Sequence, residues 1–276
     1  MLAFVVSVPV DEVDLASDVL WQLGVRAIEE RTPATTAGAA EVVELWTSVG
    51  EDRAAVERAG RRVVRWPWRT VEVSEVAADT WRDHAAPMWV DAGMVLVPAW
   101  QRHDVGESVL AVRIEPGGAF GLGDHPTTML SLRALRSMRL TGADVLDVGC
   151  GTGVLAVGAA LLGAKHVRAV DLSGAAVEAT IDNARRNGVT VEVDATPVSR
   201  LDGGHDVVVA NILAPALCEL ADDLRRLTRL DGRLVISGVL DRAHDHVVDA
   251  LAPMVVERRD TLGGWAAVTM RHPAGR

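Results

Sequence analysis

From residue 144 onward, short apolar runs alternate with stretches of helical periodicity, and this alternation restricts the possible folds more than any other feature. The expected strands are 144–148, 166–171, 190–194, 206–210 and 233–237, and the expected helices are 153–162, 174–186, 215–229 and 241–251. Strands that alternate with helices form parallel sheets covered by helices on both faces. The sequence therefore predicts an α/β fold with a doubly wound, mostly parallel sheet. Two further runs, 254–259 and 265–271, predict an antiparallel pair at the sheet edge.

The amino-terminal part has a different order of elements. Expected strands at 2–9, near 26–30, at 41–48 and at 67–74 are interleaved with a helix that Asp11 caps and a second helix over about 51–62. The order βαββαβ is typical of a small α+β ferredoxin-like domain, expected over residues 1–74.

A polar stretch separates the two parts. Residues 75–87 predict a linker helix that ends at Pro87, and the second domain then covers 88–276. Two alternating runs within 93–115 predict a hairpin that precedes the main sheet.

The chain is acidic. Its net charge of −10 argues against a nucleic-acid-binding surface, which needs a dense basic patch. The first 75 residues hold 8 Arg and 13 Asp plus Glu, so half of the negative excess lies in about a quarter of the chain. Such a concentration favours docking of a cationic partner, although a solvated acidic surface that serves solubility explains it equally well.

Neither cysteines nor histidines indicate a metal site. Cys150 and Cys218 have no partners at zinc-site spacing and are too few for a disulfide framework. The histidines of DRAHDH at 241–246 lack a third ligand group, so an exposed helix start is the preferred interpretation and no metal is expected. The first residues contain no basic region and soon reach Asp11, which predicts neither a signal peptide nor a membrane span and hence a cytoplasmic location.

The strand at 144–148 runs into a glycine-rich turn. In DVLDVGCGTG the glycines are Gly149, Gly151 and Gly153, and an apolar helix follows them. Such a turn lets backbone approach a ligand at the carboxyl end of the first strand, where doubly wound sheets bind nucleotides. The next strand ends in Asp171, whose carboxylate can accept hydrogen bonds from both ribose hydroxyls of an adenosine.

Two details favour S-adenosylmethionine over a nicotinamide dinucleotide as the adenosine ligand. The glycines follow the pattern GxGxG, whereas the dinucleotide fingerprint is GxGxxG. Asp147 precedes them, in a position to meet the amino group of a methionine moiety. A dinucleotide-dependent oxidoreductase remains the alternative.

Two further segments complete the candidate site. Asn211 follows the buried run VVVA, where active-site groups collect in such sheets, and its amide can both accept and donate hydrogen bonds. The alternative is that Asn211 caps the helix that follows, in which Pro215 is expected at the first position. The loop PGGAFGLGDHPTT at 116–128 contains Phe120 and leads into a helix, an arrangement suited to enclosing a small ligand, while His125 taken alone is expected to be a helix cap.

These motifs together resemble one family, the ribosomal protein L11 methyltransferases (PrmA). The resemblance spans nearly the whole chain and is carried by Trp81 with HAAP at 84–87, VPAW at 97–100, PGGAFG at 116–121, HPTT at 125–128, DVGCGTG at 147–153 and VANILA at 209–214. The combination of AFGxGxHPTT with ANILA is specific to few enzymes. The family shows Thr where Leu122 stands, so this chain lacks that hydroxyl.

The resemblance implies an S-adenosylmethionine-dependent methyltransferase of the Rossmann-like class that modifies amines of a large-subunit ribosomal stalk protein. The methyl donor would be held by Thr128, Gly149, Asp171 and Asn211, and Asn211 would also line the point of transfer. The ferredoxin-like domain would capture the basic protein substrate. A monomer without direct nucleic-acid contact is expected. The alternatives are another protein-lysine target and a non-catalytic scaffold that binds the cofactor.

Overall fold

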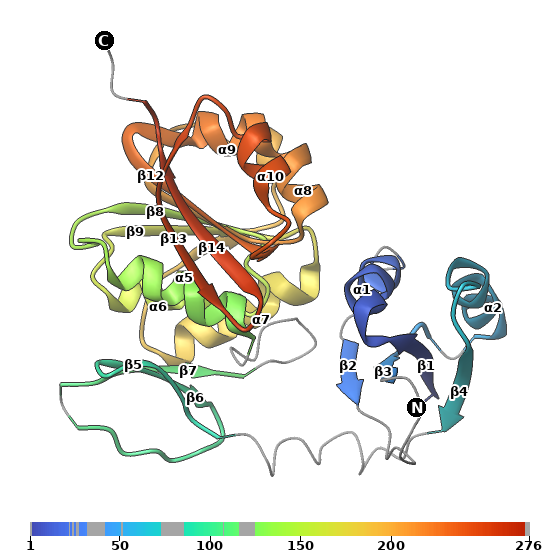
Figure 1. The fold of residues 1–276 in the computed structure, drawn as a ribbon. Coiled ribbons are helices and arrows are strands. Elements are labelled where there is room, and N and C mark those ends of the chain that lie inside the picture. The colour runs from blue at the N-terminus through green and yellow to red at the C-terminus, as the bar shows by residue number, and fades with distance from the viewer. Residues whose placement is uncertain are drawn as a thin grey trace. The chain divides into compact units, whose positions relative to one another are not determined.

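The computed structural model describes residues 2–21, 23, 25, 28–31, 42–50, 52–72, 86–106, 108–115 and 125–273. The chain divides into two compact units, Met1–Ala85 and Ala86–Arg276 (Figure 1). The predicted linker helix at 75–87 falls almost entirely outside the described residues. Within the described parts of the chain, no helix is long and apolar enough to cross a membrane.

The first unit is an antiparallel four-stranded sheet covered by two helices on one face. Its elements are β1 (Leu2–Pro9), a 3-10 turn η1 (Val10–Glu12), α1 (Val13–Trp21), β2 (Ile28–Arg31), β3 (Val42–Thr47), α2 (Arg53–Arg62) and β4 (Trp68–Glu72). The strand order β2-β3-β1-β4 is the order of a ferredoxin-like sheet, as the sequence predicts. Alternate residues of β1, among them Phe4 and Val6, pack with Leu20 and Ala59 in the core of this unit.

The second unit is built on a seven-stranded sheet. Its strands are β8 (Asp144–Val148), β9 (His166–Val170), β10 (Glu192–Asp194), β11 (His205–Asn211), β12 (Thr228–Leu240), β13 (Val255–Leu262) and β14 (Trp265–Arg271). Their order is β10-β9-β8-β11-β12-β14-β13, with the first five parallel and β14 antiparallel to both of its neighbours. The predicted α/β sheet and its antiparallel closing pair are confirmed.

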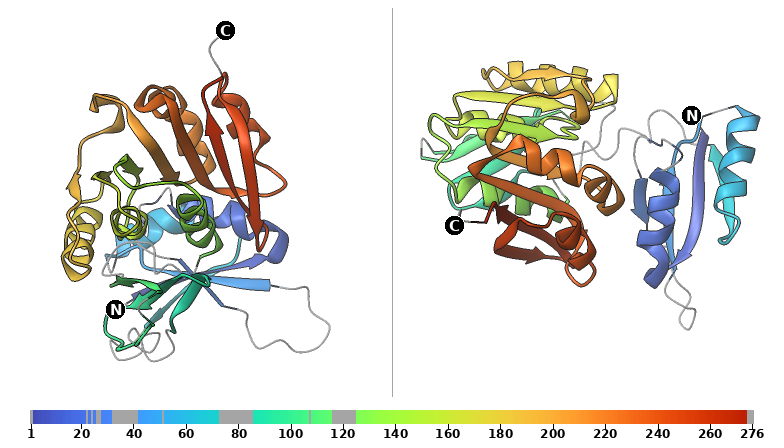
Figure 2. Two further views of the ribbon diagram at one scale, coloured as in Figure 1. Left: turned by 90° about the vertical axis from the view of Figure 1, so that its left-hand side faces the viewer. Right: turned by 90° about the horizontal axis from the view of Figure 1, so that it is seen from above.

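Helices cover both faces of this sheet (Figures 1 and 2). The helices are α5 (Pro126–Arg136), α6 (Val154–Leu161), α7 (Gly174–Arg186), α8 (Ala214–Glu219), α9 (Ala221–Leu227) and α10 (Asp245–Ala250). The first three pack with Val145 and Val209 in one core, and the last three pack with Leu146 and Val208 in the other. Neighbouring strand residues therefore face opposite layers, which is why both members of each of these pairs are apolar.

Two predicted helices differ from those observed. The expected helix 215–229 is divided at Leu220 (φ −90°, ψ 3°), where the sequence has neither Gly nor Pro to signal a break. It ends at Leu227, because Thr228 already belongs to β12. The expected helix 241–251 begins only at Asp245, since the backbone N–H of Asp241 donates instead to the carbonyl of Gly264, 2.9 Å away.

The predicted hairpin within 93–115 is wrong. The structure has a small sheet of β5 (Met88–Asp91), β6 (Met94–Pro98) and β7 (Leu110–Ile114), in which β5 and β6 are antiparallel but β6 and β7 are parallel. A parallel pair needs a connection that carries the chain back along the sheet, and residues 99–109 provide it. Alternation of apolar residues identifies a strand but not its direction, so the sequence pattern could not distinguish the two arrangements.

Candidate functional site

The turn after β8 holds three glycines in a backbone conformation that other residues rarely adopt. Gly149, Gly151 and Gly153 have φ values of 71°, 55° and 76°. The N–H of Gly149 donates to the carbonyl of Val170 at 2.8 Å, which ties the turn to the end of β9. A Cβ atom on Gly149 would lie only 2.4 Å from Cγ2 of Ile212. The position therefore needs glycine for both its conformation and its close packing.

Asp171 lies beside this turn, directly after β9. Its Oδ2 accepts from the N–H of Gly151 at 3.0 Å, and its Oδ1 accepts from the N–H of Ser173 at 2.9 Å. These two bonds fix the orientation of the carboxylate. Each carboxylate oxygen can accept more than one hydrogen bond, so Asp171 can still receive two hydroxyl donors from a ribose.

Asp147, in β8, is buried with one of its oxygens unsatisfied. The residue is 1% exposed, and its Oδ2 accepts from the N–H of Ala156 at 3.0 Å. Oδ1 is also buried and has no hydrogen-bond partner among the residues that the structure describes. Burial raises the pKa of Asp147 to about 7, and the negative charge of Asp171 adds to this effect. Since a buried acceptor without a donor is costly, this oxygen suits a ligand that brings an ammonium group.

Asn211 is the last residue of β11 and pairs with Ser237 of β12. The alternative role as a helix cap is wrong, because the N-cap of α8 is Leu213, which makes no side-chain cap hydrogen bond. Pro215 accordingly stands at the second helical position. The Asn211 side chain therefore belongs to the carboxyl edge of the sheet, at the edge that carries the glycine turn and Asp171.

Thr128 lies in the first turn of α5, and 1% of it is exposed. The start of this helix is joined to the sheet through Ser237, whose hydroxyl lies 2.9 Å from the carbonyl of Ala266 and 3.4 Å from that of Thr127. His125 is the N-cap, as predicted: its Nδ1 accepts from the N–H of Thr127 at 3.4 Å. The His125 ring also packs edge-on against Trp265, with centroids 4.7 Å apart.

Hydrogen bonds and packing thus connect the predicted site residues at one edge of the sheet. Asp171 bonds to the glycine turn, the turn packs on Ile212 next to Asn211, and Asn211 pairs with Ser237 beside the start of α5. Phe120 and Leu122 lie outside the described residues.

The sequence interpretation missed three residues around this edge. Leu172, next to Asp171, is 80% exposed. Thr180 and Asn183 of α7 are fully buried and bond to the glycine turn. Their spacing of three residues on one helix was the available signal, but it does not reveal which loop they contact.

His244, expected in an exposed helix start, is in fact only 6% exposed. Its Nδ1 lies 2.8 Å from the carbonyl of Leu240. Residue 244 precedes α10, and the end of β12 provides the polar partner that allows burial. The expectation failed because the sequence does not show that the chain folds back onto this strand.

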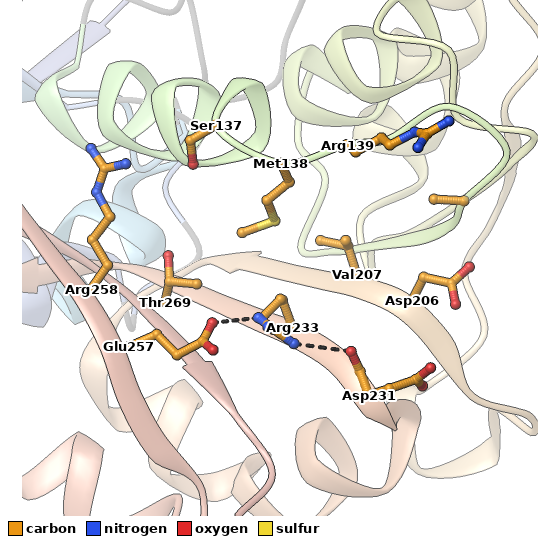
Figure 3. A pocket seen from close by; sticks show the side chains of 11 residues that line it. Ser137, Met138, Arg139, Asp206, Val207, Asp231, Arg233, Glu257, Arg258 and Thr269 are labelled. Atoms are coloured by element: carbon orange, nitrogen blue, oxygen red, sulfur yellow. Dashed lines mark hydrogen bonds and ion pairs between the residues drawn. The ribbon is translucent and has the colours of Figure 1, made fainter. Parts of the chain in front are cut away.

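A cavity of about 460 Å³ lies elsewhere in the second unit (Figure 3). It is lined by the end of α5 and by residues near the starts of β11 and β12, including Arg139, Asp206 and Arg233. Arg233 pairs with Glu257 and donates to the carbonyl of Asp231 (Figure 3). This cavity is therefore at the amino edge of the sheet and is separate from the glycine turn.

Comparison with known proteins gives a consistent result. A family profile described as ribosomal protein L11 methyltransferase (PrmA) matches residues 12–273. The chain is 39% identical over 267 residues to the ribosomal protein L11 methyltransferase of Methylococcus capsulatus, covering 89% of this chain and 90% of the relative. It is 38% identical over 215 residues to that of Citrifermentans bemidjiense, covering 75% and 70%. The crystal structure of ribosomal protein L11 methylase from Lactobacillus delbrueckii subsp. bulgaricus superposes with a TM-score of 0.64 at 30% identity, covering 68% of this chain and all of that one.

Proposed function

The chain belongs to the ribosomal protein L11 methyltransferase family, and from this premise we propose that it methylates amino groups of ribosomal protein L11 with S-adenosylmethionine as the donor. The amines would be lysine side chains, the N-terminal amine, or both. Its relatives carry this activity in their names. The enzyme would act in the cytoplasm, where ribosomal proteins are assembled, as a monomer without direct contact to nucleic acid.

The observation that supports the donor most strongly is the buried Oδ1 of Asp147, to which no residue in the described part of the chain donates a hydrogen bond. S-adenosylmethionine carries an ammonium group that would satisfy this oxygen, and its sulfonium adds a second positive charge. A nicotinamide dinucleotide would instead bring its anionic pyrophosphate to a turn that already has Asp147 and Asp171 beside it. The carboxylates therefore favour the methyl donor over the dinucleotide.

We assign the following roles to the residues at this edge. Asp171 would accept hydrogen bonds from the ribose hydroxyls, Asp147 would bind the methionine ammonium group, and the backbone of Gly149 and Gly151 would pass close to the donor. Thr128, Asn211 and Phe120 would complete the donor pocket. When bound, S-adenosylmethionine supplies an electrophilic methyl group on a positively charged sulfur.

The chain's own contribution to transfer would be alignment. The lone pair of a neutral amine forms the new N–C bond as the C–S bond breaks, a neutral thioether leaves, and the amine proton passes to solvent. Asn211 would hold the amine in line by accepting, at Oδ1, a hydrogen bond that an N–H of the amine donates. Proximity and orientation then account for most of the rate enhancement, and no strong acid or base is needed.

We further propose that residues 1–74 recognise the substrate protein and that residues 88–276 carry out the transfer. The first 75 residues, with 13 acidic side chains against 8 Arg, suit a lysine-rich partner. All the donor-binding candidates belong to the second part of the chain.

Transfer to purified ribosomal protein L11 tests the proposal. The full chain is incubated with L11 and methyl-labelled S-adenosylmethionine, and peptides are analysed by mass spectrometry. We expect label on L11 amines, and Asn211→Ala should lower turnover about 100-fold, since alignment of the amine is lost. Donor binding without transfer to any protein would support the scaffold alternative, and transfer only to another protein would identify a different target.

A further inference from the structure

Helix α7 contacts the site through the residue that precedes it and through two polar side chains further along the helix. Directly before the helix, the N–H of Ser173 donates to Asp171 at 2.9 Å. Two turns further on, Thr180 and Asn183 face inward and are completely buried. Two buried polar side chains on a helix each need a hydrogen-bond partner, and here the partners lie outside the helix.

Both side chains hydrogen-bond to carbonyl oxygens of the glycine-rich turn. Oγ1 of Thr180 donates to the carbonyl of Gly151 at 3.1 Å, and Nδ2 of Asn183 donates to the carbonyl of Thr152 at 2.9 Å. Thr180 also fills the space beside Gly153, where a Cβ atom would lie 2.7 Å from its Cγ2. Helix α7 thus binds two carbonyl groups of the turn, while Asp171 accepts a hydrogen bond from the backbone N–H of Gly151 in the same turn.

Asn183 also holds Glu115, the residue that directly follows strand β7. Its Oδ1 accepts from the N–H of Glu115 at 2.9 Å, and its Nδ2 donates to the carbonyl of the same residue at 2.8 Å. Asn187, one turn along, holds Arg113 in the same way, with bonds of 2.8 Å and 2.7 Å. The two amides therefore act as a substitute for a neighbouring strand along the edge of the small sheet. Only Asn183 also bonds to the glycine turn.

We propose that Asn183 is a positioning residue for the methyl donor: it fixes the glycine-rich turn relative to β7 and so maintains the shape of the donor site. This inference rests on the proposed function. The amide has three hydrogen bonds in a fully buried position, so its orientation is determined. Its loss would leave the carbonyl of Thr152 without this donor and allow the turn to relax away from the conformation that receives the ligand.

The chain offers a matched control in Asn187. Asn183→Ala and Asn187→Ala each remove an amide that makes two bonds to one backbone residue, Glu115 directly after β7 for Asn183 and Arg113 within β7 for Asn187. The third bond of Asn183 goes to the turn, whereas that of Asn187 goes to the carbonyl of Asn183 at 2.7 Å. Calorimetric titration with S-adenosylmethionine and with S-adenosylhomocysteine measures the effect. We expect the Kd of both ligands to rise about tenfold for Asn183→Ala, and to stay within about twofold of wild type for Asn187→Ala. In transfer assays the KM for the donor should rise while kcat at saturating donor changes little.

A second variant keeps the proposal testable if Asn183→Ala does not fold. Thr180→Val preserves shape and removes only a hydroxyl bonded to the turn, so the Kd should rise about threefold. Equal Kd values for Asn183→Ala and wild type, or an equal loss of affinity in Asn187→Ala, would overturn the assignment. If Asn183→Ala does not fold, an unchanged Kd for Thr180→Val would do the same. Absence of S-adenosylmethionine binding by the wild-type chain would instead overturn the proposed function itself, so the two failures are distinguishable.

Discussion

Strand β8 has an aspartate near each end, and the two lie in opposite electrostatic environments. At the amino edge of the sheet, Arg229 lies between Asp144 and Asp206 and forms an ion pair with each. The backbone N–H of Asp144 and the Arg229 guanidinium lower the pKa of Asp206. At the carboxyl edge, Asp147 forms no ion pair with any of the described residues, and its pKa is raised to about 7, chiefly by burial.

This contrast shows which end of the sheet is organised for stability and which for a ligand. A buried carboxylate without a counter-charge destabilises the fold, whereas ion-paired carboxylates near the surface are readily accommodated. Such an unfavourable group is retained where a ligand will neutralise it. The buried Asp147 carboxylate therefore destabilises the carboxyl edge, whereas the ion-paired aspartates do not destabilise the amino edge.

The largest change in donor affinity is expected when a single methyl group is added at the carboxyl edge, and the same addition at the amino edge serves as the control. Gly149→Ala and Gly142→Ala both place a side chain at positive φ, 71° and 83° respectively. The new Cβ would lie 2.4 Å from Ile212 in the first variant and would have no neighbour within 4 Å in the second. We expect the Kd for S-adenosylmethionine to rise about 100-fold only in Gly149→Ala, as measured by calorimetry. Similar Kd values for the two variants would show that conformational strain alone, rather than the packing on Ile212, governs the site.

A smaller effect is expected when the uncompensated charge is removed. Asp147→Asn should raise the Kd for S-adenosylmethionine about 30-fold, because a charge-assisted hydrogen bond is lost. At pH 8 the same variant should melt at a higher temperature than wild type, because no buried charge remains. Arg229→Ala is the control at the other edge, and it should lower the melting temperature without changing the Kd. A stable Asp147→Asn variant that binds the donor normally would disprove the role given to Asp147.

The smallest effect is the pH dependence of folding stability and of donor affinity in the wild-type chain. Because the folded pKa of Asp147 is about 7, its stabilising contribution is complete below the unfolded pKa of about 4 and is lost as the pH rises through 7. Asp206, with a lowered pKa, contributes in the opposite sense: its stabilisation is present above about pH 4 and is lost in acid. Donor affinity should rise about tenfold from about pH 5.5 to pH 7 as Asp147 ionises. Titrations that show the same slope in Asp147→Asn would assign it to another group.

The parts of this molecule that depend on local pattern could be predicted from the sequence. The difference between strand and helix periodicity predicts the order of elements around β8 and β9. Parallel strands end at a common edge, so Gly149, Asp171 and Asn211 were expected to lie at the same edge from their places at the carboxyl ends of three strands. The resemblance to the family adds Thr128, whose distance in sequence from the strands gives no such indication.

The remaining features depend on contacts between distant segments. The direction of β7, the break at Leu220 and the burial of His244 are each decided by what the chain packs against. The contacts of Asn183 join α7 to residues 68 and 31 positions earlier, and no periodicity within α7 reveals them. The raised pKa of Asp147 likewise follows from burial by the surrounding core, which a one-dimensional sequence pattern does not describe.

The strand order also has a consequence for the time course of folding. Strand β8 lies between β9 and β11, and the bond from the N–H of Asp144 to Asp206 spans 62 residues of sequence. Bringing such distant segments together costs chain entropy before any pairing energy is gained, so central pairing of this kind slows folding. The glycines of the turn at Gly149 are close together in the sequence. Ile212, against which the turn packs, reaches its place only after β11 has paired with β8. The ligand-binding edge is therefore a late product of folding, formed after the βαβ unit of β8, α6 and β9 has become ordered.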